Sequence, residues 1–452
     1  MAFRDLRDVL EWIRGRGLLL EVREELSCRY EVSAFLGAAG RRIGKAVLLR
    51  AASGHRVPVI ANVAFGREVI AQAMGVAPEN LVQGLRTRQG SRVEPRAVGA
   101  ADAPVLEVTE PAVDLSRAMP ILTHYAGDSG PFITSGLISA RDPETGAVAR
   151  GIHRMELRGE DRLGAALMNP PLADAYAKAK ARRERLPVAV SVGIEPAVFV
   201  AAAQSVPPQT DKLSLAGALR GEPVEVVAGP LTSIPVPARA EFLLEGELDP
   251  EDERNDGPLG EVTGYYLAFP NTPTLHVQRI HHRQDPLYHA LLPTGREVDV
   301  LLAVVGEASL VPAVRDLFPF VTRVHFVPGT FGTSVAVSVA ATAKFQVRSL
   351  LTHLLSLSRI KKAVIVAEDV NEADPLELEW SIATRCQPDR DAIVLADLKG
   401  TPIDPSGPEP FRTAKIGIDA TGFERVKGWT RALFPPEAVS RAEDAAKRAG
   451  DA

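Results

Sequence analysis

The hydrophobic pattern changes twice along this chain of 452 residues, and these changes restrict the fold more than any single motif does. Residues 1–115 alternate helix-like and strand-like segments, residues 116–310 consist mainly of strand-like segments, and residues 311–452 alternate strand and helix again. Alternating strands and helices are typical of an α/β domain, whereas a run of strands predicts a separate sheet-based domain. We therefore expect a mixed α/β protein with three domains at these boundaries.

Local patterns within the three parts predict individual elements. In the central part, "ITSGLISAR" and "GIHRMELRG" lie on either side of "DPETG", which carries the Asp, Pro and Gly of a hairpin turn. The segment "LADAYAKAKARRER" predicts a helix among the central strands, and "PPEAVSRAEDAAKRAG" predicts a last, polar helix. A first helix is predicted because apolar residues recur at helical spacing near the amino terminus. These apolar residues are Phe3, Leu6, Val9, Leu10 and Ile13.

Composition excludes several classes of protein. The formal net charge is -5 and the pI is about 6.1, so no general positive field would attract nucleic acid or an anionic membrane. Cys28 and Cys386 do not form a C-x-x-C motif, and they predict neither a disulfide framework nor a thiolate metal site. No stretch approaches the roughly 18 apolar residues of a membrane span. We expect a cytoplasmic protein without nucleic-acid or membrane partners, and the excess of arginine over lysine is typical of a thermophile or a GC-rich genome.

The common catalytic motifs are missing from the sequence. There is no H-E-x-x-H, no G-x-S-x-G and no G-x-G-x-x-G, and the segment "GRRIGKA" has Ala where a phosphate-binding P-loop requires Ser or Thr. These absences argue against common hydrolase and nucleotidase chemistry.

The segment "DGPLGEVTGYY" at residues 256–266 places two carboxylates, Asp256 and Glu261, around a Gly-Pro turn. Asp256 alone would satisfy a turn, so Glu261 needs a separate explanation. In "GIHRMEL", strand alternation places Arg154 on the face opposite His153, and a cation turned inward would need carboxylate partners. Taken alone, these charges are more simply explained as a turn cap and solvated surface groups.

Eight segments follow one another in order over most of the chain: "ILTHYAGDSGPFITSGLISARDPETG", "GIHRMELRGEDRLG", "LPVAVSVGIEP", "VPARAEFLLEGELDP", "DGPLGEVTGYY", "DPLYHALLPTGRE", "WSIATRCQPDRD" and "KIGIDAT". Together they resemble the UbiD-like family of prenylated-FMN-dependent decarboxylases. Any one segment would be a weak signal, but their shared order makes a strong one. The resemblance implies a central split β-barrel that binds flavin, between an N-terminal α/β domain and a C-terminal α/β oligomerisation domain.

The resemblance also implies a catalytic site made of Arg154, Asp256 and Glu261 over the modified flavin. Glu261 would donate the proton to the carbon that loses carbon dioxide. Asp256 and Arg154 would hold Glu261 and the cofactor in place through charge-assisted hydrogen bonds. Two acids that share one arginine can hold protons with different affinities, which explains why the segment carries both. The family more often has Glu at the first position, so Asp256 is a shortened variant.

The cofactor contacts are implied in the same way. Lys415 would contact the flavin phosphate, and Glu241 with Asn169 would ligate a divalent cation beside it, expected to be Mn2+, with K+ as a further candidate ion. Two usual ligands are changed, because Ala149 and Asn169 stand where the family usually has Asn and His. On sequence alone, Glu241 would be an edge charge and Lys415 a surface lysine. The other implied flavin contacts are Gly151, Ile152, His153, Arg154 and Met168.

The segment "YHALLPTGRE" contains two candidates for binding a second anionic group of the substrate, His289 and Arg296. A satisfied strand histidine explains His289 equally well. The resemblance extends to relatives that act on aromatic, heteroaromatic and α,β-unsaturated acids, and to an archaeal branch that acts on a phosphorylated unsaturated acid of the mevalonate route.

We therefore expect a non-oxidative, reversible decarboxylase of a small carboxylic acid. The resemblance implies a flavin prenyltransferase that supplies the cofactor, and assembly as a homodimer or homohexamer. Ala149 and Asn169 leave a second hypothesis open, a non-catalytic flavin-binding or assembly paralogue of the family. A flavin reductase with a split barrel is a third hypothesis, but it would not explain the paired acids.

Overall fold

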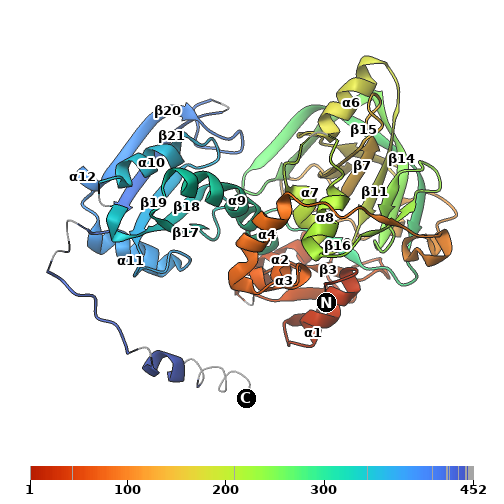
Figure 1. Cartoon of the computed structure of the whole chain (residues 1–452). Helices are drawn as coiled ribbons and strands as arrows, with labels where there is room; N and C mark the ends of the chain where they lie inside the picture. Colours follow the sequence, from red (N-terminus) through yellow and green to blue (C-terminus); the bar gives the residue numbers. More distant parts are fainter. Residues whose placement is uncertain are drawn as a thin grey trace.

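The computed structural model folds the chain into two lobes, and one long helix, α9 (Arg296–Leu317), lies between them (Figure 1). The larger lobe holds the N-terminal and central parts, and the smaller lobe holds the C-terminal part. α9 crosses the boundary predicted at residue 310, so the central and C-terminal parts share one continuous element. The structure describes residues 2–42, 44–207, 209–343, 345–409, 411–423, 426, 428–435, 437–442 and 445.

The N-terminal part is a four-stranded sheet with helices packed around it. β2 pairs in parallel with β1 and antiparallel with β3, and β16 (Tyr288–Ala290) joins the sheet beside β3 from a distant part of the chain. The segment that contains His289 is therefore built into the N-terminal sheet. The other elements are β1 (Leu19–Val22), β2 (Ala46–Leu49), β3 (Val59–Ala61), α1 (Leu6–Arg14), α2 (Glu31–Arg42), α3 (Arg67–Ala73), α4 (Leu81–Gln89), η1 (Pro78–Asn80), η2 (Ala100–Asp102) and η3 (Pro104–Leu106).

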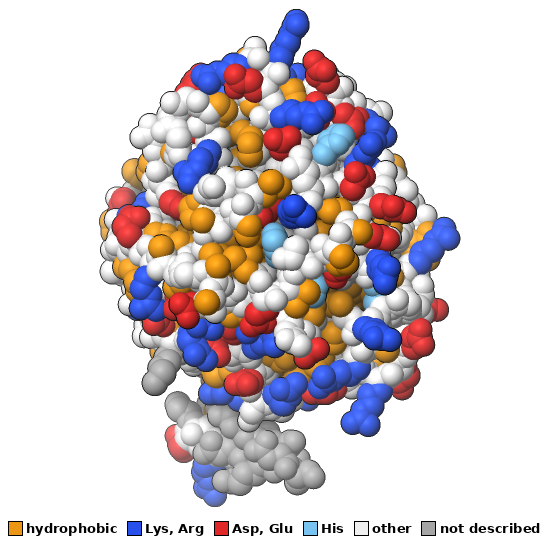
Figure 2. Space-filling model, turned by 90° about the vertical axis from the view of Figure 1, so that its right-hand side faces the viewer, with side chains coloured by type: hydrophobic (Ala, Val, Ile, Leu, Met, Phe, Trp, Pro, Cys, Tyr) orange, Lys and Arg blue, Asp and Glu red, His pale blue; other side chains and the backbone are white. Residues whose placement is uncertain are grey.

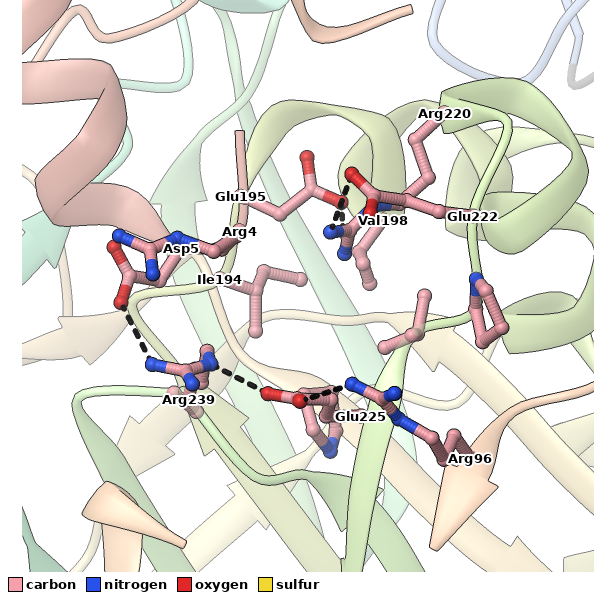
Figure 3. Close-up of a pocket in the computed structure, with 14 residues that line it drawn as sticks. Arg4, Asp5, Arg96, Ile194, Glu195, Val198, Arg220, Glu222, Glu225 and Arg239 are labelled. Carbon is pink, nitrogen blue, oxygen red and sulfur yellow. Dashed lines mark hydrogen bonds and ion pairs between the residues drawn. The ribbon is translucent and has the colours of Figure 1, made fainter. Parts of the chain in front are cut away.

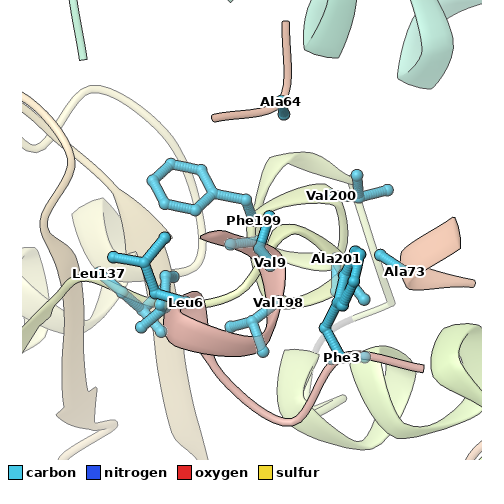
Figure 4. Close-up of a cluster of buried hydrophobic side chains, with 14 of the residues drawn as sticks. Phe3, Leu6, Val9, Ala64, Ala73, Leu137, Val198, Phe199, Val200 and Ala201 are labelled. Atoms are coloured by element: carbon cyan, nitrogen blue, oxygen red, sulfur yellow. The ribbon is translucent and has the colours of Figure 1, made fainter. Parts of the chain in front are cut away.

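Helix α1 has the apolar face that the sequence predicts. Asp5 caps the helix by accepting hydrogen bonds of 3.0 Å from the backbone nitrogens of Arg7 and Asp8. The predicted apolar residues are all buried. In Figure 4, Leu6 and Val9 lie beside the side chains of α7 (Pro196–Ala203), in the cluster that joins the N-terminal and central parts.

The central part is a nine-stranded antiparallel sheet with the strand order β6-β9-β10-β15-β14-β11-β7-β8, and β5 pairs with β15 beside this path. β8 and β9 follow each other in the chain but lie near opposite ends of this order, and only His153 and Arg154 connect them. A link of two residues keeps the Cα atoms of Ile152 and Met155 within about 11 Å. The sheet must therefore curl until its two ends meet, and we call the place where β8 passes to β9 the seam.

The central strands are β5 (Val108–Thr109), β6 (Phe132–Ile133), β7 (Leu137–Arg141), β8 (Val148–Ile152), β9 (Met155–Leu157), β10 (Arg162–Ala165), β11 (Leu186–Val192), β14 (Phe242–Gly260) and β15 (Tyr266–His282). A smaller sheet of order β13-β12-β4 lies beside them. Its strands and the remaining helices of this part are β4 (Arg96–Ala97), β12 (Glu225–Ala228), β13 (Pro235–Pro237), α5 (Leu115–Ala118), α6 (Leu172–Ala181), α7 and α8 (Lys212–Arg220).

The prediction that "GIHRMELRG" forms one strand of the hairpin is wrong. β8 ends at Ile152 because it pairs with β7, whereas β9 begins at Met155 and pairs with β6 and β10. Arg154 lies between the two strands, so strand alternation does not determine its direction. The hairpin itself is confirmed, since β7 and β8 pair antiparallel across the predicted turn.

The longest hairpin of the protein is made by β14 and β15, which pair from Phe242↔His282 to Gly260↔Tyr266. Several register shifts interrupt the pairing, and two of them flank Asp256. Such irregularities bend a strand and redirect its side chains. Asp256 and Glu261 therefore lie where the far end of the hairpin departs from a regular ladder.

The smaller lobe is a five-stranded sheet of order β17-β18-β19-β21-β20, in which β18, β19 and β21 run parallel. The predicted alternation of strand and helix is confirmed here. The predicted last helix, "PPEAVSRAEDAAKRAG", falls partly outside the described residues. The elements are β17 (Val321–Phe326), β18 (Ser334–Val339), β19 (Lys362–Ala367), β20 (Ala392–Lys399), β21 (Arg412–Ala420), η4 (Ala341–Ala343), α10 (Val347–Ser356), α11 (Pro375–Arg385) and α12 (Pro388–Asp391).

The surface carries charges of both signs. On the face shown in Figure 2, positive and negative side chains are interspersed around a central group of hydrophobic ones. None of the helices in the described part of the chain combines the length and the apolar character that crossing a membrane requires.

Truncation of Leu6 tests the packing between α1 and the rest of the larger lobe. Leu6 is fully buried, so Leu6→Ala is expected to lower the free energy of unfolding by about 2–5 kcal/mol, because it leaves a cavity. Glu11→Ala on the exposed side of the same helix is the control and should stay within about 0.5 kcal/mol. Urea unfolding followed by circular dichroism measures both. Equal losses in the two variants would contradict the packing described here.

Candidate active site

Arg154 leaves the seam and points its guanidinium at the far end of the β14–β15 hairpin. Its Nε donates to Asp256 Oδ1 at 2.8 Å, and its Nη2 donates to the same oxygen and to the carbonyl oxygen of Leu267 at 3.0 Å. Its Nη1 donates to Glu261 Oε1. The guanidinium carbon lies 4.6 Å from the ring centre of Phe269, close enough for a cation–π contact. One arginine thus joins both acids of the segment.

Asp256 occupies the dry side of this cluster. Its side chain is fully buried, and Oδ2 has no hydrogen-bond partner within the described residues. Burial raises the pKa of the Asp256 carboxyl above its ordinary value, and the Arg154 guanidinium opposes part of that rise. A buried carboxylate oxygen without a partner is costly, so this atom is available to an additional donor.

Glu261 occupies the open side of the cluster. Its side chain keeps 20% of its surface exposed, against 0% for Asp256. It follows the last residue of β14, where its backbone nitrogen donates to Tyr265 O at 2.9 Å and its carbonyl oxygen accepts from Gly264 N at 2.8 Å. The tight turn holds Glu261 beside Arg154 while its carboxylate stays accessible. The two acids therefore share a cation but have different access to water.

Gly257 is required at the point where the hairpin approaches Arg154. Its φ of 86° lies in the left-handed region that favours glycine. A Cβ at this position would lie 3.1 Å from Arg154 Nη2 and 2.9 Å from Leu267 O. A side chain here would disturb the contact that the arginine makes with Asp256.

A cavity of about 770 Å³ opens beside the seam, and we call it the seam cavity. It lies within the range of about 300–1,000 Å³ that small-molecule sites occupy. Four of the predicted flavin contacts line it, namely Gly151, Ile152, His153 and Asn169. A Cβ on Gly151 would lie 2.7 Å from His153 Nε2, so glycine keeps the wall of the cavity open. The structure thus brings these predicted residues together around a space of the size that small-molecule ligands occupy.

His153 is a neutral donor and acceptor in the wall of the seam cavity. Its Nδ1 lies 3.0 Å from Ala166 O, which assigns the hydrogen to Nδ1 and leaves Nε2 as an acceptor. Burial lowers the pKa of His153 to about 4, so the ring is uncharged at neutral pH.

A second cavity of about 750 Å³ lies where the two lobes face each other, and we call it the interlobe cavity. Thr263 and Gly264, directly after Glu261, line it together with Arg296. The Nε of Arg296 donates to Phe65 O at 2.7 Å, and no acidic side chain of the described chain pairs with this arginine. α9 contributes residues to both cavities, so the same helix forms part of each wall.

Several predicted site residues lie elsewhere. Glu241 is fully buried, and its carboxylate accepts hydrogen bonds from two nitrogens of Arg7 at 3.0 Å, from Leu287 N at 3.0 Å and from Arg283 at 3.4 Å. It does not line the seam cavity with Asn169, so the two predicted metal ligands are not brought together. Within the described residues, no group of three or more His, Cys, Asp or Glu side chains is arranged to hold a metal ion. These donors do not fit a divalent cation.

Lys415, Met168 and His289 also lie outside the two cavities. Lys415 is buried on β21, its Nζ donates to Leu357 O at 2.6 Å, and burial lowers its pKa. Met168 is half exposed next to Asn169. His289 is a buried strand histidine whose Nε2 lies 3.3 Å from Glu297 Oε1, although its Nδ1 has no described partner. The geometry of His289 agrees with the structural interpretation of that residue.

A third, smaller cavity of about 80 Å³ lies under α7 and the small sheet (Figure 3). Glu225 accepts from Arg96 and Arg239 at 2.6 Å each. Burial raises the pKa of Glu195 to about 7, and Oε1 of this residue lies 3.9 Å from Arg220. The cavity is too small for a flavin, and most of its charges pair with one another.

Two residues of the site were not identified from the sequence. Phe269 in "YYLAFP" packs against Arg154, and Lys212 in "TDKLSLAG" lines the seam cavity. A lysine at the start of a largely apolar helix is a weak signal for the second residue. The sequence carried no comparable signal for the first.

Comparison with known proteins identifies the class that this fold and site define. Three consecutive family models match the chain: the 3-octaprenyl-4-hydroxybenzoate carboxy-lyase N-terminal domain over residues 10–89, the Rift-related domain over residues 96–296 and the C-terminal domain over residues 299–420. The chain therefore belongs to the UbiD family of carboxy-lyases, and the expected fold class is confirmed.

Individual relatives match over nearly the whole chain. An anhydromevalonate phosphate decarboxylase of Methanosarcina mazei is 32% identical over 95% of this chain and 99% of its own. The structure of the UbiD-class enzyme HmfF from Pelotomaculum thermopropionicum in complex with FMN superimposes with a TM-score of 0.92 at 33% identity, covering 97% of this chain and 99% of that one. An evolved dimeric form of HmfF in complex with prFMN gives a TM-score of 0.87 at 33% identity, covering 96% and 98%.

Removal of Arg154 tests the charge balance of the cluster. In Arg154→Met the pKa of the buried Asp256 carboxyl should rise further. A carboxyl whose pKa is higher in the folded state makes the protein less stable as the pH rises from the unfolded-state pKa toward the folded-state pKa. The variant is expected to be only mildly destabilised near about pH 4 and by about 3–5 kcal/mol near neutral pH. Unfolding in urea at several pH values measures this.

The double variant Arg154→Met/Asp256→Asn is the control for this experiment. It removes the titrating carboxyl, so the pH-dependent part of the loss should disappear. A loss in Arg154→Met that does not change with pH would contradict the assignment.

Proposed function

We propose that this chain catalyses the reversible, non-oxidative decarboxylation of an α,β-unsaturated, aromatic or heteroaromatic carboxylic acid with prenylated FMN bound in the seam cavity. The observation that carries this proposal is the joining of Asp256 and Glu261 by Arg154, whose neighbour in the chain, His153, lines a cavity of about 770 Å³. A buried acid and an accessible acid on one cation suit a site where one group positions and the other transfers a proton. The complexes of the relative HmfF with FMN and with prFMN support the choice of cofactor.

In this proposal, backbone and neutral side chains form part of the wall that holds the flavin in the seam cavity. His153 offers an acceptor at Nε2, and Gly151 keeps the wall open next to it. When bound, the prenylated flavin supplies the electron sink that allows carbon dioxide to leave the substrate. The chain's own residues bind the flavin, exclude water and place the proton.

In this proposal, the carbon–carbon bond to the carboxylate breaks, and its electron pair stays on the substrate carbon. Glu261 then delivers a proton from its carboxyl to that carbon and regains one from solvent, to which 20% of its side chain is exposed. Arg154 fixes the position of Glu261, and Asp256 fixes Arg154 from the buried side. In the reverse direction Glu261 acts as the base. Neither direction consumes redox equivalents.

The interlobe cavity is the proposed place of substrate selection. It adjoins the turn that carries Glu261, and Arg296 has no acidic partner there. A guanidinium without a counter-ion suits a second anionic group on the substrate. This feature, with the 32% identity to an anhydromevalonate phosphate decarboxylase, favours a phosphorylated unsaturated acid over a heteroaromatic acid that has no second anionic group.

Cofactor supply, location and assembly complete the proposal. A flavin prenyltransferase would provide the modified flavin, the protein would act in the cytoplasm, and it would assemble as a homodimer or homohexamer.

The alternative is a non-catalytic flavin-binding paralogue. Co-expression with a flavin prenyltransferase, followed by mass spectrometry of the bound cofactor and assay with unsaturated and aromatic acids, separates the two. Turnover of any acid by the prenylated-FMN form supports the enzyme, whereas full occupancy without turnover supports the paralogue.

Glu261→Gln tests the assignment of the proton donor. The amide keeps the shape and the hydrogen bond to Arg154 but holds no transferable proton, so decarboxylation should fall by about 10²–10⁴-fold while flavin stays bound. Incubation with product in heavy water and detection of deuterium at the reacting carbon measures the step directly. Asp256→Asn is the matched variant and should be milder. Deuterium entry at the wild-type rate in Glu261→Gln would mean that another group moves the proton.

Arg296→Ala tests substrate selection. KM for a phosphorylated unsaturated acid should rise by about 10-fold or more, because a charge-assisted hydrogen bond is lost, while KM for an unphosphorylated acid should change little. Arg67→Ala is the control, since Arg67 lines the same cavity but already pairs with Glu307 at 2.9 Å. An equal loss on every acid with Arg296→Ala would assign Arg296 a structural role.

A further inference from the structure

Lys212 is a buried cation without an acidic partner. The residue is 6% exposed, and its Nζ donates a hydrogen bond of 2.6 Å to Ala202 O. The adjacent Asp211 does not neutralise it, because the Asp211 carboxylate accepts bonds of 2.8 and 3.1 Å from Arg150. Nowhere in the described chain does an acidic side chain form an ion pair with Lys212. An ammonium carries three donors, so two remain for other acceptors.

The unpaired ammonium belongs to the wall of the seam cavity. Lys212 and Asn169 both line it, as does His153. Burial is the main cause of the lowered pKa of His153, and the charge of Lys212 lowers this pKa further, because the two side chains are close enough to interact electrostatically. The other lysine of the wall, Lys178, is already paired with Asp142 at 2.7 Å and with Glu144 at 3.2 Å.

A buried ammonium without a counter-ion destabilises the protein in which it lies. Burial lowers the pKa of Lys212 to about 8, so much of the population still carries the charge at neutral pH. A ligand with a negatively charged oxygen at this wall would accept hydrogen bonds from the two remaining donors of Lys212 Nζ and neutralise its charge. The phosphate of a flavin mononucleotide is such a group, and the ring system of the flavin is uncharged.

The positions of the predicted metal ligands and of the predicted phosphate contact also favour Lys212 as the positive charge at this site. The predicted ligands Asn169 and Glu241 are separated, and the Glu241 carboxylate is already held by Arg7 and Arg283. The predicted phosphate contact Lys415 is buried on β21 and hydrogen-bonded to Leu357 O. Lys212 therefore provides a positive charge at the seam cavity, and no group of three or more His, Cys, Asp or Glu side chains in the described chain is arranged to hold a cation there.

We propose that Lys212 binds the phosphate of the flavin and takes the place of a divalent cation as its counter-charge. The inference rests on the proposed function, because it requires a flavin in the seam cavity. It adds that cofactor retention in this chain depends on an ammonium and not on a metal ion.

Binding of FMN and riboflavin to the full-length apo protein tests the proposal, because riboflavin lacks only the phosphate. Flavin fluorescence titrations are run on the wild type, Lys212→Met, Lys212→Arg and the control Lys178→Met, each with and without EDTA. Lys212→Met should weaken FMN binding by about 10- to 100-fold and leave riboflavin binding unchanged. Lys212→Arg should recover part of the loss. Lys178→Met and EDTA should leave the FMN-to-riboflavin ratio at its wild-type value.

The thermal unfolding midpoint of the apo protein gives a second readout. Lys212→Met removes a buried unpaired charge, so the midpoint should stay the same or rise, which separates lost phosphate binding from misfolding. A wild-type FMN-to-riboflavin ratio in Lys212→Met would overturn the inference and leave the proposed function standing. A loss of FMN affinity with EDTA as large as that caused by Lys212→Met would also overturn it. Binding of neither flavin to the wild type would overturn the proposed function and this inference with it.

Discussion

The contact on which the rest of the site depends is the one between Arg154 and the two carboxylates of the β14–β15 hairpin. Arg154 reaches them because β8 and β9 are joined by only two residues across the curled sheet. The link holds Arg154 outside both strand ladders, and its guanidinium is free to turn toward Asp256 and Glu261. The same curl of the sheet that brings β8 next to β9 therefore also places Arg154 beside the two carboxylates. The seam cavity opens at the same place, so the curl of the sheet also positions the proposed cofactor site.

The cluster divides its two acids by solvent access. Asp256 is fully buried with one unpartnered oxygen, whereas Glu261 keeps part of its carboxylate open. Without Arg154, the buried Asp256 would be a costly charge and the accessible Glu261 an ordinary one. The shared arginine joins the two acids into one hydrogen-bonded cluster. The same principle operates in the cavity wall, where Lys212 carries an uncompensated charge that a ligand would satisfy. In both places a buried polar group lacks some of its hydrogen-bond partners: Asp256 Oδ2 has none in the described chain, and Lys212 Nζ has one. A bound ligand could supply the missing partners.

The sequence predicted those features that depend on local pattern. The apolar face of α1, the hairpin of β7 and β8 and the alternation of the smaller lobe follow from hydrophobic period and turn residues, and the order of eight segments indicated the family. The seam was not predictable, since it depends on which distant strands pair. Glu241 shows the same limit, because its partner Arg7 lies 234 residues away in the chain. Lys212 was missed because a single lysine says nothing about its burial until the cavity around it is known.

The central claim is that this chain, loaded with prenylated FMN, catalyses a decarboxylation that consumes no redox equivalents. Its most direct test is a stoichiometry measurement on the holoenzyme loaded with prenylated FMN. The enzyme is supplied anaerobically with candidate acids, and carbon dioxide, product and any added electron acceptor or donor are quantified together. The account predicts one carbon dioxide for each product molecule, without consumption of oxidant or reductant. Full cofactor occupancy with no carbon dioxide from any acid, or turnover only with an oxidant, would contradict it.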